Sequence, residues 1–105
     1  MTNETLIQLM KKIGSDKTYL TDGYYRIRDN KSGQKELAFL KPDGCGTTSV
    51  NPQITVEEVD GNWLAVKLMD MGNNSTKFII RDDATKEELD NELEKLIKKM
   101  EEAIQ

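Results

Sequence analysis

The spacing of apolar residues changes twice along this 105-residue chain, and these changes limit the folds that it can adopt. Apolar residues recur every three or four positions over residues 2–14 and again over residues 82–105, which predicts one amphipathic helix near each end. Between these segments the spacing falls to two, as it does in half-buried strands. The residues expected to form the two apolar helix faces are Leu6, Leu9, Met10, Ile13, Leu89, Leu93, Leu96, Met100 and Ala103.

Turn residues divide the middle of the chain into short strands. Asp60-Gly61, between two alternating runs, predicts a tight hairpin, and Asn51-Pro52 is expected to interrupt a strand. The predicted strands cover residues 24–28, 35–41, 53–59, 63–69 and 76–81, with at most a short strand at 47–50. Because consecutive strands usually pair as neighbours, we expect one α+β domain over residues 1–105. It would comprise an N-terminal helix, a five- to six-stranded, mostly antiparallel meander sheet and a C-terminal amphipathic helix, with both helices packed on one sheet face.

The predicted strand 63–69 contains the only tryptophan and suggests an interaction surface. Strict alternation places Leu64, Val66 and Leu68 on one face. If the helices cover that face, the other would carry an exposed apolar patch, of the kind that anchors protein interfaces. The residues of this expected patch are Trp63, Ala65 and Met69. Two alternatives stay open: the indole folds over the sheet edge, or the sheet is covered on both sides.

A second candidate site lies on the predicted strand 24–28. Tyr24, Arg26 and Arg28 share one face of this strand, and such a face can stack a base or grip a phosphate or carboxylate. Arg81 would join them if the strands that carry these residues are neighbours. The alternative is a solvated outer face on which the arginine stems cover apolar surface.

The chain contains no histidine, which restricts the chemistry that it can perform. Neither a Ser-His-Asp nor a Cys-His catalytic apparatus can be built without that residue. The single cysteine, Cys45, cannot form an intramolecular disulfide, and its Pro-Asp-Gly-Cys-Gly surroundings favour a turn over a reactive thiol. One cysteine with carboxylates is also a poor ligand set for zinc. An enzyme that uses carboxylates, lysine or tyrosine stays open as the hypothesis ranked last, and we expect no catalytic residues, no metal and no cofactor.

Charge is distributed unevenly between the two halves of the chain. Residues 1–52 carry 8 Lys and Arg against 6 Asp and Glu, a net +2, whereas residues 53–105 carry 7 against 13, a net −6. This balance argues against nucleic-acid binding, which draws on clustered positive charge. The acidic half could instead meet a basic surface of a partner protein, or it could be a solvated helix face.

These features favour a small acidic, non-catalytic protein-binding module, such as an inhibitor, an immunity-type protein, a chaperone or an adaptor. Self-association as a homodimer is compatible with the Trp63 sheet face or with the C-terminal helix. The alternative is a module that holds a nucleotide or another small anion on the Tyr24, Arg26 and Arg28 face. No apolar run approaches the ~20 residues of a membrane span, and residues 1–12 do not resemble a signal peptide. We therefore expect a cytoplasmic protein without membrane contact.

Overall fold

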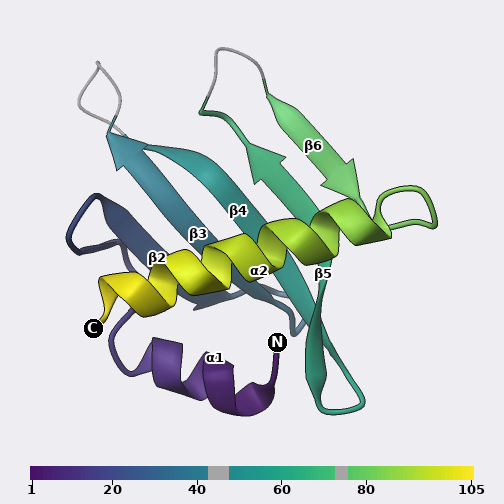
Figure 1. Cartoon of the computed structure of the whole chain (residues 1–105), viewed down its shortest axis with the longest axis horizontal. Helices are drawn as coiled ribbons and strands as arrows, with labels where there is room; N and C mark the ends of the chain where they lie inside the picture. The colour runs from purple at the N-terminus through teal and green to yellow at the C-terminus, as the bar shows by residue number, and fades with distance from the viewer. Residues whose placement is uncertain (43–47, 73–75) are drawn as a thin grey trace.

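The computed structural model of the chain describes residues 1–42, 48–72 and 76–105. The six strands form one antiparallel sheet in the order β1-β2-β3-β4-β5-β6, so every strand pairs with its neighbour in sequence. The predicted α+β meander with a helix at each end is confirmed (Figure 1). The predicted turn around Cys45 lies outside the described residues. The elements are α1 (Asn3–Met10), β1 (Thr18–Tyr19), β2 (Tyr24–Asp29), β3 (Lys35–Pro42), β4 (Thr48–Val59), β5 (Asn62–Asp70), β6 (Lys77–Ile80) and α2 (Lys86–Ala103).

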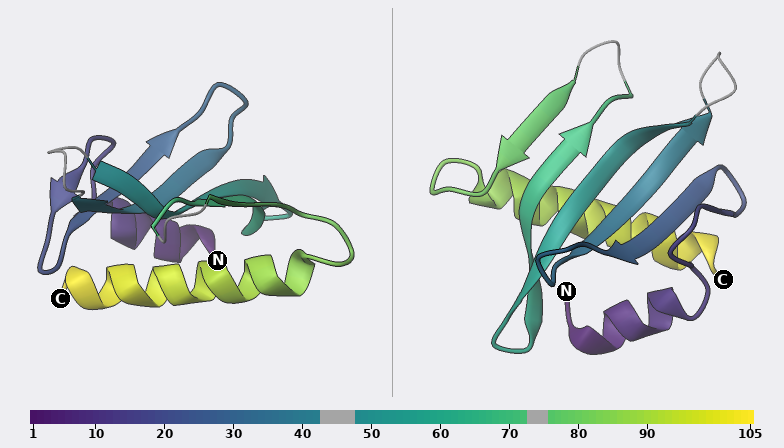
Figure 2. Two further views of the ribbon diagram at one scale, coloured as in Figure 1. Left: turned by 90° about the horizontal axis from the view of Figure 1, so that it is seen from above. Right: turned by 180° about the vertical axis from the view of Figure 1, so that it is seen from behind.

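The helix α2 lies across one face of the sheet, and α1 packs near it at the end of the strands (Figures 1 and 2). The predicted apolar stripe of α2 is buried along its whole length, and α1 contributes Leu6 and Leu9 to the same core. Full burial of one large aliphatic side chain contributes roughly 1.5–3 kcal/mol, so this shared core holds the layers together. In the described residues, neither helix combines the length and the apolar character that a membrane span requires. The strand residues of the core include Ile27, Leu37, Ile54, Leu68 and Ile79.

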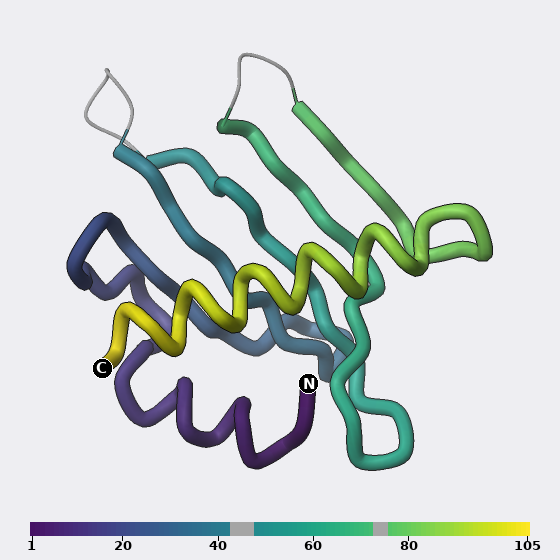
Figure 3. Tube along the Cα trace, viewed as in Figure 1, coloured from purple at the N-terminus to yellow at the C-terminus, as the bar shows by residue number. Residues whose placement is uncertain are grey.

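The strands differ from the prediction at Asn51-Pro52. The expected break there is wrong, because β4 runs through both residues as one strand of 12 residues. Ala38 and Leu40 of β3 pair with Gln53 and Val50, so β4 carries one residue more than β3 over this stretch. An extra residue of this kind is a β-bulge, which is one of the few places where a sheet accepts proline. The chain path through this bulge and the rest of the meander is traced in Figure 3.

A second irregularity, in β5, changes which side chains face the core. Thr55 pairs with Lys67, but the next residue of β4 pairs with Ala65, so Val66 is an extra residue on β5. An insertion of one residue reverses the alternation of all residues on one side of it. Ala65 and Leu68 are therefore both buried, and the predicted common face of Leu64, Val66 and Leu68 is wrong.

The hairpin between β4 and β5 agrees with the prediction. Val59 pairs with Asn62, which leaves Asp60 and Gly61 as a two-residue loop, and both have positive φ angles of 52° and 83°. Two positive φ angles define the type I′ turn, whose twist matches that of the strands. Beyond this turn, Thr2 forms an isolated bridge to Asn62, so the segment before α1 covers the outer edge at the start of β5.

Candidate functional site

Trp63 belongs to the interior of the protein. Its side chain is 7% exposed and Ala65 is fully buried, so the expected exposed patch of Trp63, Ala65 and Met69 is wrong. The indole N–H donates a hydrogen bond to Asn3 Oδ1 at 3.2 Å, and the backbone N–H donates to Met1 O at 2.8 Å. The bulge at Val66 explains the error, because it brings Ala65 into phase with the core residues of β5.

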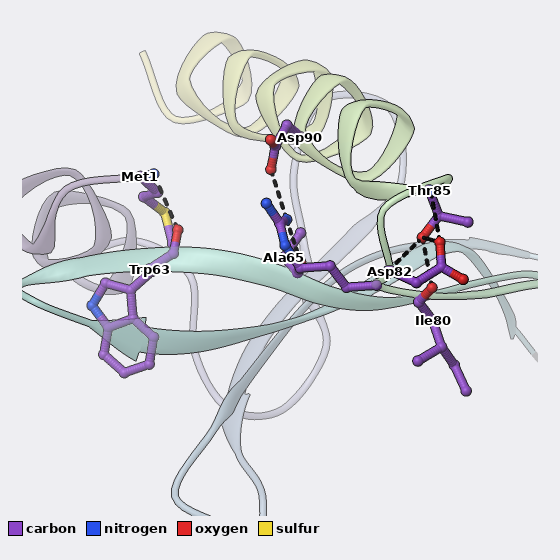
Figure 4. A network of polar contacts seen from close by, with 8 residues as sticks. Met1, Trp63, Ala65, Ile80, Asp82, Thr85 and Asp90 are labelled. Atoms are coloured by element: carbon purple, nitrogen blue, oxygen red, sulfur yellow. Dashed lines mark hydrogen bonds and ion pairs between the residues drawn. The ribbon is translucent and has the colours of Figure 1, made fainter.

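Met69 instead lies beside two exposed apolar residues of β6, on the sheet face without helices. Phe78 is 55% exposed and pairs with Met69, and Ile80 is 57% exposed and pairs with Lys67. Directly paired residues of antiparallel strands point to the same face, so these side chains lie side by side. Figure 4 shows the Ile80 side chain pointing away from α2. We call the three residues Met69, Phe78 and Ile80 the β6 strip.

The backbone of β6 is also available at this position, because β6 is the last strand of the sheet. The N–H of Arg81 donates to Val66 O at 2.9 Å. In an antiparallel pair such inward bonds alternate along the strand, so the N–H and C=O groups of Phe78 and Ile80 point outward. The Ile80 carbonyl accepts a hydrogen bond from Thr85 Oγ1 at 2.7 Å (Figure 4), whereas the outward groups of Phe78 have no partner among the described residues.

A small hollow borders the β6 strip on the same sheet face. Its volume is about 190 Å³, below the roughly 300–1,000 Å³ of typical small-molecule pockets. Thr55 is the one polar residue of the described chain that is classed as buried, and it lies in the wall of this hollow. The dimensions suit an inserted side chain better than a whole cofactor. The hollow is lined by Asn30, Glu36, Gln53, Thr55, Lys67, Leu68, Met69 and Phe78.

Tyr24, Arg26 and Arg28 do share one face of β2, but both arginines already donate hydrogen bonds to other side chains of the protein. Arg26 Nη2 donates to Gln53 Oε1 and Arg28 Nε donates to Glu36 Oε1, each at 2.7 Å. Burial lowers the pKa of Arg26, and the nearby charge of Arg28 lowers it further. The Nε of Arg26 is buried without a hydrogen-bond partner, where a bound anion would not reach it. The ring of Tyr24 packs edge-on against Tyr19, at 5.3 Å between centroids.

Arg81 does not join this group. β3, β4 and β5 separate β2 from β6, so the condition for a cluster with Arg26 and Arg28 is not met. Arg81 Nη1 instead donates to Ala65 O and to Asp90 Oδ1, each at 2.9 Å, and thereby connects β5 with α2.

The sequence did not single out Phe78 and Ile80 as surface residues. They flank Ile79 in an uninterrupted apolar run, and alternation alone cannot decide which face of such a run is buried. The structure buries Ile79, which is 8% exposed, and leaves its two neighbours in solvent. The only sequence signal is that three apolar residues occur together where a half-buried strand needs two at most.

Known proteins do not identify the site. Comparison of the chain with protein-family models, with curated proteins and with solved structures found no match. Within residues 1–42, 48–72 and 76–105, no three His, Cys, Asp or Glu side chains converge in a group that could hold a metal ion. The assignment of function therefore rests on the geometry of the surface.

Proposed function

We propose that this protein is a non-catalytic protein-binding module that binds an extended segment of another protein along β6. The observation that carries the proposal is the exposure of Phe78 and Ile80 on β6, whose outer edge pairs with no strand among the described residues. Exposed apolar groups and free backbone groups on one edge are the two elements that strand addition uses. The absence of histidine from the sequence supports a non-catalytic role.

The energetics suit a specific contact of moderate strength. Phe78 and Ile80 are each about half exposed, so covering them gains roughly 1 kcal/mol apiece, about half of the 1.5–3 kcal/mol for burying a whole large apolar side chain. The outward backbone groups of Phe78 add hydrogen bonds whose net contribution is about 0.5–1.5 kcal/mol each. A side chain of the partner can enter the adjoining hollow and add to this sum. The net charge of −6 over residues 53–105 favours a partner with a basic surface.

A capture experiment with two matched variants tests this proposal. The immobilised wild-type protein, the double variant Phe78→Lys/Ile80→Lys and the control Ile7→Lys/Met10→Lys are exposed to extract of the source cell. Both pairs are exposed apolar residues and both variants gain the same charge, but Ile7 and Met10 lie on α1. We expect one protein to be retained by the wild type and the control and lost by the β6 variant.

The retained protein is then purified and its dissociation constant is measured with all three forms. We expect the β6 variant to bind at least about tenfold more weakly, which corresponds to 1.4 kcal/mol. Equal binding by all three forms would overturn the proposal. The alternative is that β6 binds a second copy of this chain. Sedimentation equilibrium would then show an apparent mass that increases with concentration for the wild type but not for the β6 variant.

A further inference from the structure

A groove between the two helices forms a second surface, away from the β6 strip. Its volume is about 460 Å³, and it lies between the start of α1, the start of β5 and one side of α2. Each α2 residue in its wall has another wall residue three or four positions away, so together they form one stripe along the helix. The groove is lined by Met1, Thr2, Thr5, Trp63, Leu64, Asp90, Leu93, Glu94, Ile97 and Glu101.

The floor of this groove is apolar and fixed in position. Trp63 and Leu93 are buried, whereas Leu64 and Ile97 are half-buried and retain apolar surface that faces solvent. The hydrogen bonds from Trp63 to Asn3 and to the Met1 carbonyl hold the indole in place. An apolar floor that is already ordered costs little conformational entropy when a partner covers it.

The rim of the groove is acidic. Asp90, Glu94 and Glu101 are all exposed and follow the α2 side of the groove. Asp90 is paired with Arg81, but Glu94 and Glu101 have no ion-pair partner among the described residues. Asp90 and Glu101 are 11 positions apart, so the rim extends over about 16 Å at 1.5 Å per helical residue.

We propose that this groove receives a basic amphipathic helix of another protein. The apolar face of that helix would cover Leu64 and Ile97, and its Lys or Arg side chains would reach Glu94 and Glu101. Three turns of such a helix match the length of the rim. A small cationic ligand is shorter than the distance between the rim carboxylates. The acidic rim repels nucleic acid. This inference does not depend on the β6 strip, which occupies the opposite face of the sheet.

Trp63 lines the groove, but its indole lies on the side of β5 away from α2 (Figure 4), so binding is measured by isothermal titration calorimetry. The probe is a synthetic peptide of about four helical turns, with leucine on one face and lysine on the other. We expect saturable binding, a gain of helical circular dichroism in the peptide, and weaker binding as salt increases. A peptide with glutamate in place of lysine is expected not to bind.

Two charge-matched variants separate the groove from the general acidity of α2. Glu94→Lys/Glu101→Lys reverses the rim, whereas Glu87→Lys/Glu102→Lys makes the same charge change at exposed α2 positions that do not line the groove. We expect the rim variant to weaken binding about tenfold, a loss of 1.4 kcal/mol, and the control to weaken it less than about threefold. Equal weakening by both variants, a bound peptide without helix, or no binding by the wild type would overturn the inference.

Discussion

Arg81 is fixed between Ala65 and Asp90: its Nη1 donates to the Ala65 carbonyl on β5 and to the Asp90 carboxylate on α2, each at 2.9 Å (Figure 4). This arginine directly follows β6, so one side chain connects the edge strand, its neighbour and the helix above them. The link adds a polar contact to the apolar core that packs α2 on the sheet.

Arg81→Met is expected to destabilise the fold by about 1–2 kcal/mol, because it removes the charged donor from a backbone carbonyl. Asp90→Asn is expected to cost less than about 1 kcal/mol, since the carboxylate is 52% exposed and solvent screens the ion pair. Urea unfolding of both variants measures these differences. A larger loss for Asp90→Asn than for Arg81→Met would show that the ion pair, and not the bond to Ala65, dominates the link.

Trp63→Ala is expected to destabilise the protein by about 3–5 kcal/mol, because Trp63 is a core residue and its removal leaves a cavity. Such a loss is a large part of the 5–15 kcal/mol that usually stabilises a domain. Phe78→Ala, at an exposed position, is expected to cost much less. Thermal or urea unfolding distinguishes the two positions, and similar small losses for both would contradict the burial of Trp63.

Tyr25 predicts a loss of stability at alkaline pH. Burial raises the pKa of the Tyr25 phenol, and its hydrogen bond to Asp22 Oδ1, at 2.8 Å, raises the pKa further. The unfolded chain therefore releases this proton near pH 10, the ordinary tyrosine value, while the native state keeps it. Release from the unfolded state alone favours unfolding, so stability is present below about pH 10 and declines above it.

Tyr25→Phe has no phenol to ionise and is expected to show a shallower decline in the free energy of unfolding above pH 10. Urea unfolding at a series of pH values measures both slopes. At neutral pH this variant is expected to lose about 0.5–1.5 kcal/mol with the hydrogen bond to Asp22. Identical alkaline slopes for the wild type and the variant would mean that Tyr25 ionises in the native protein as freely as in the unfolded chain.

The parts of the fold that local chemistry determines could be predicted from the sequence. The stripe from Leu89 to Ala103 recurs at helical spacing and is buried as expected, and Asp60-Gly61 forms the expected turn. In both cases the residues that carry the signal are near one another in the chain, so no knowledge of partner strands is needed.

The candidate site could not be predicted, because it depends on how the strands pair. The extra residue at Val66 is defined only by the pairing with β4, and the sequence of β5 contains no signal that predicts it. That single insertion places Ala65 in the core with Trp63 and removes both from the expected patch. Likewise, the assignment of Ile79 to the core, and of its neighbours to solvent, follows from its pairing with Leu68.

Hydrogen exchange at the Phe78 amide tests the proposed binding along β6 most directly. This N–H points outward from the edge strand, so strand addition would give it a hydrogen-bond acceptor. With the captured partner in excess, we predict that exchange at Phe78 slows at least about tenfold, as expected for a new bond of 1.4 kcal/mol or more. Amides of α1 are predicted to exchange at an unchanged rate. Unchanged exchange at Phe78, with protection appearing elsewhere in the complex, would contradict the account.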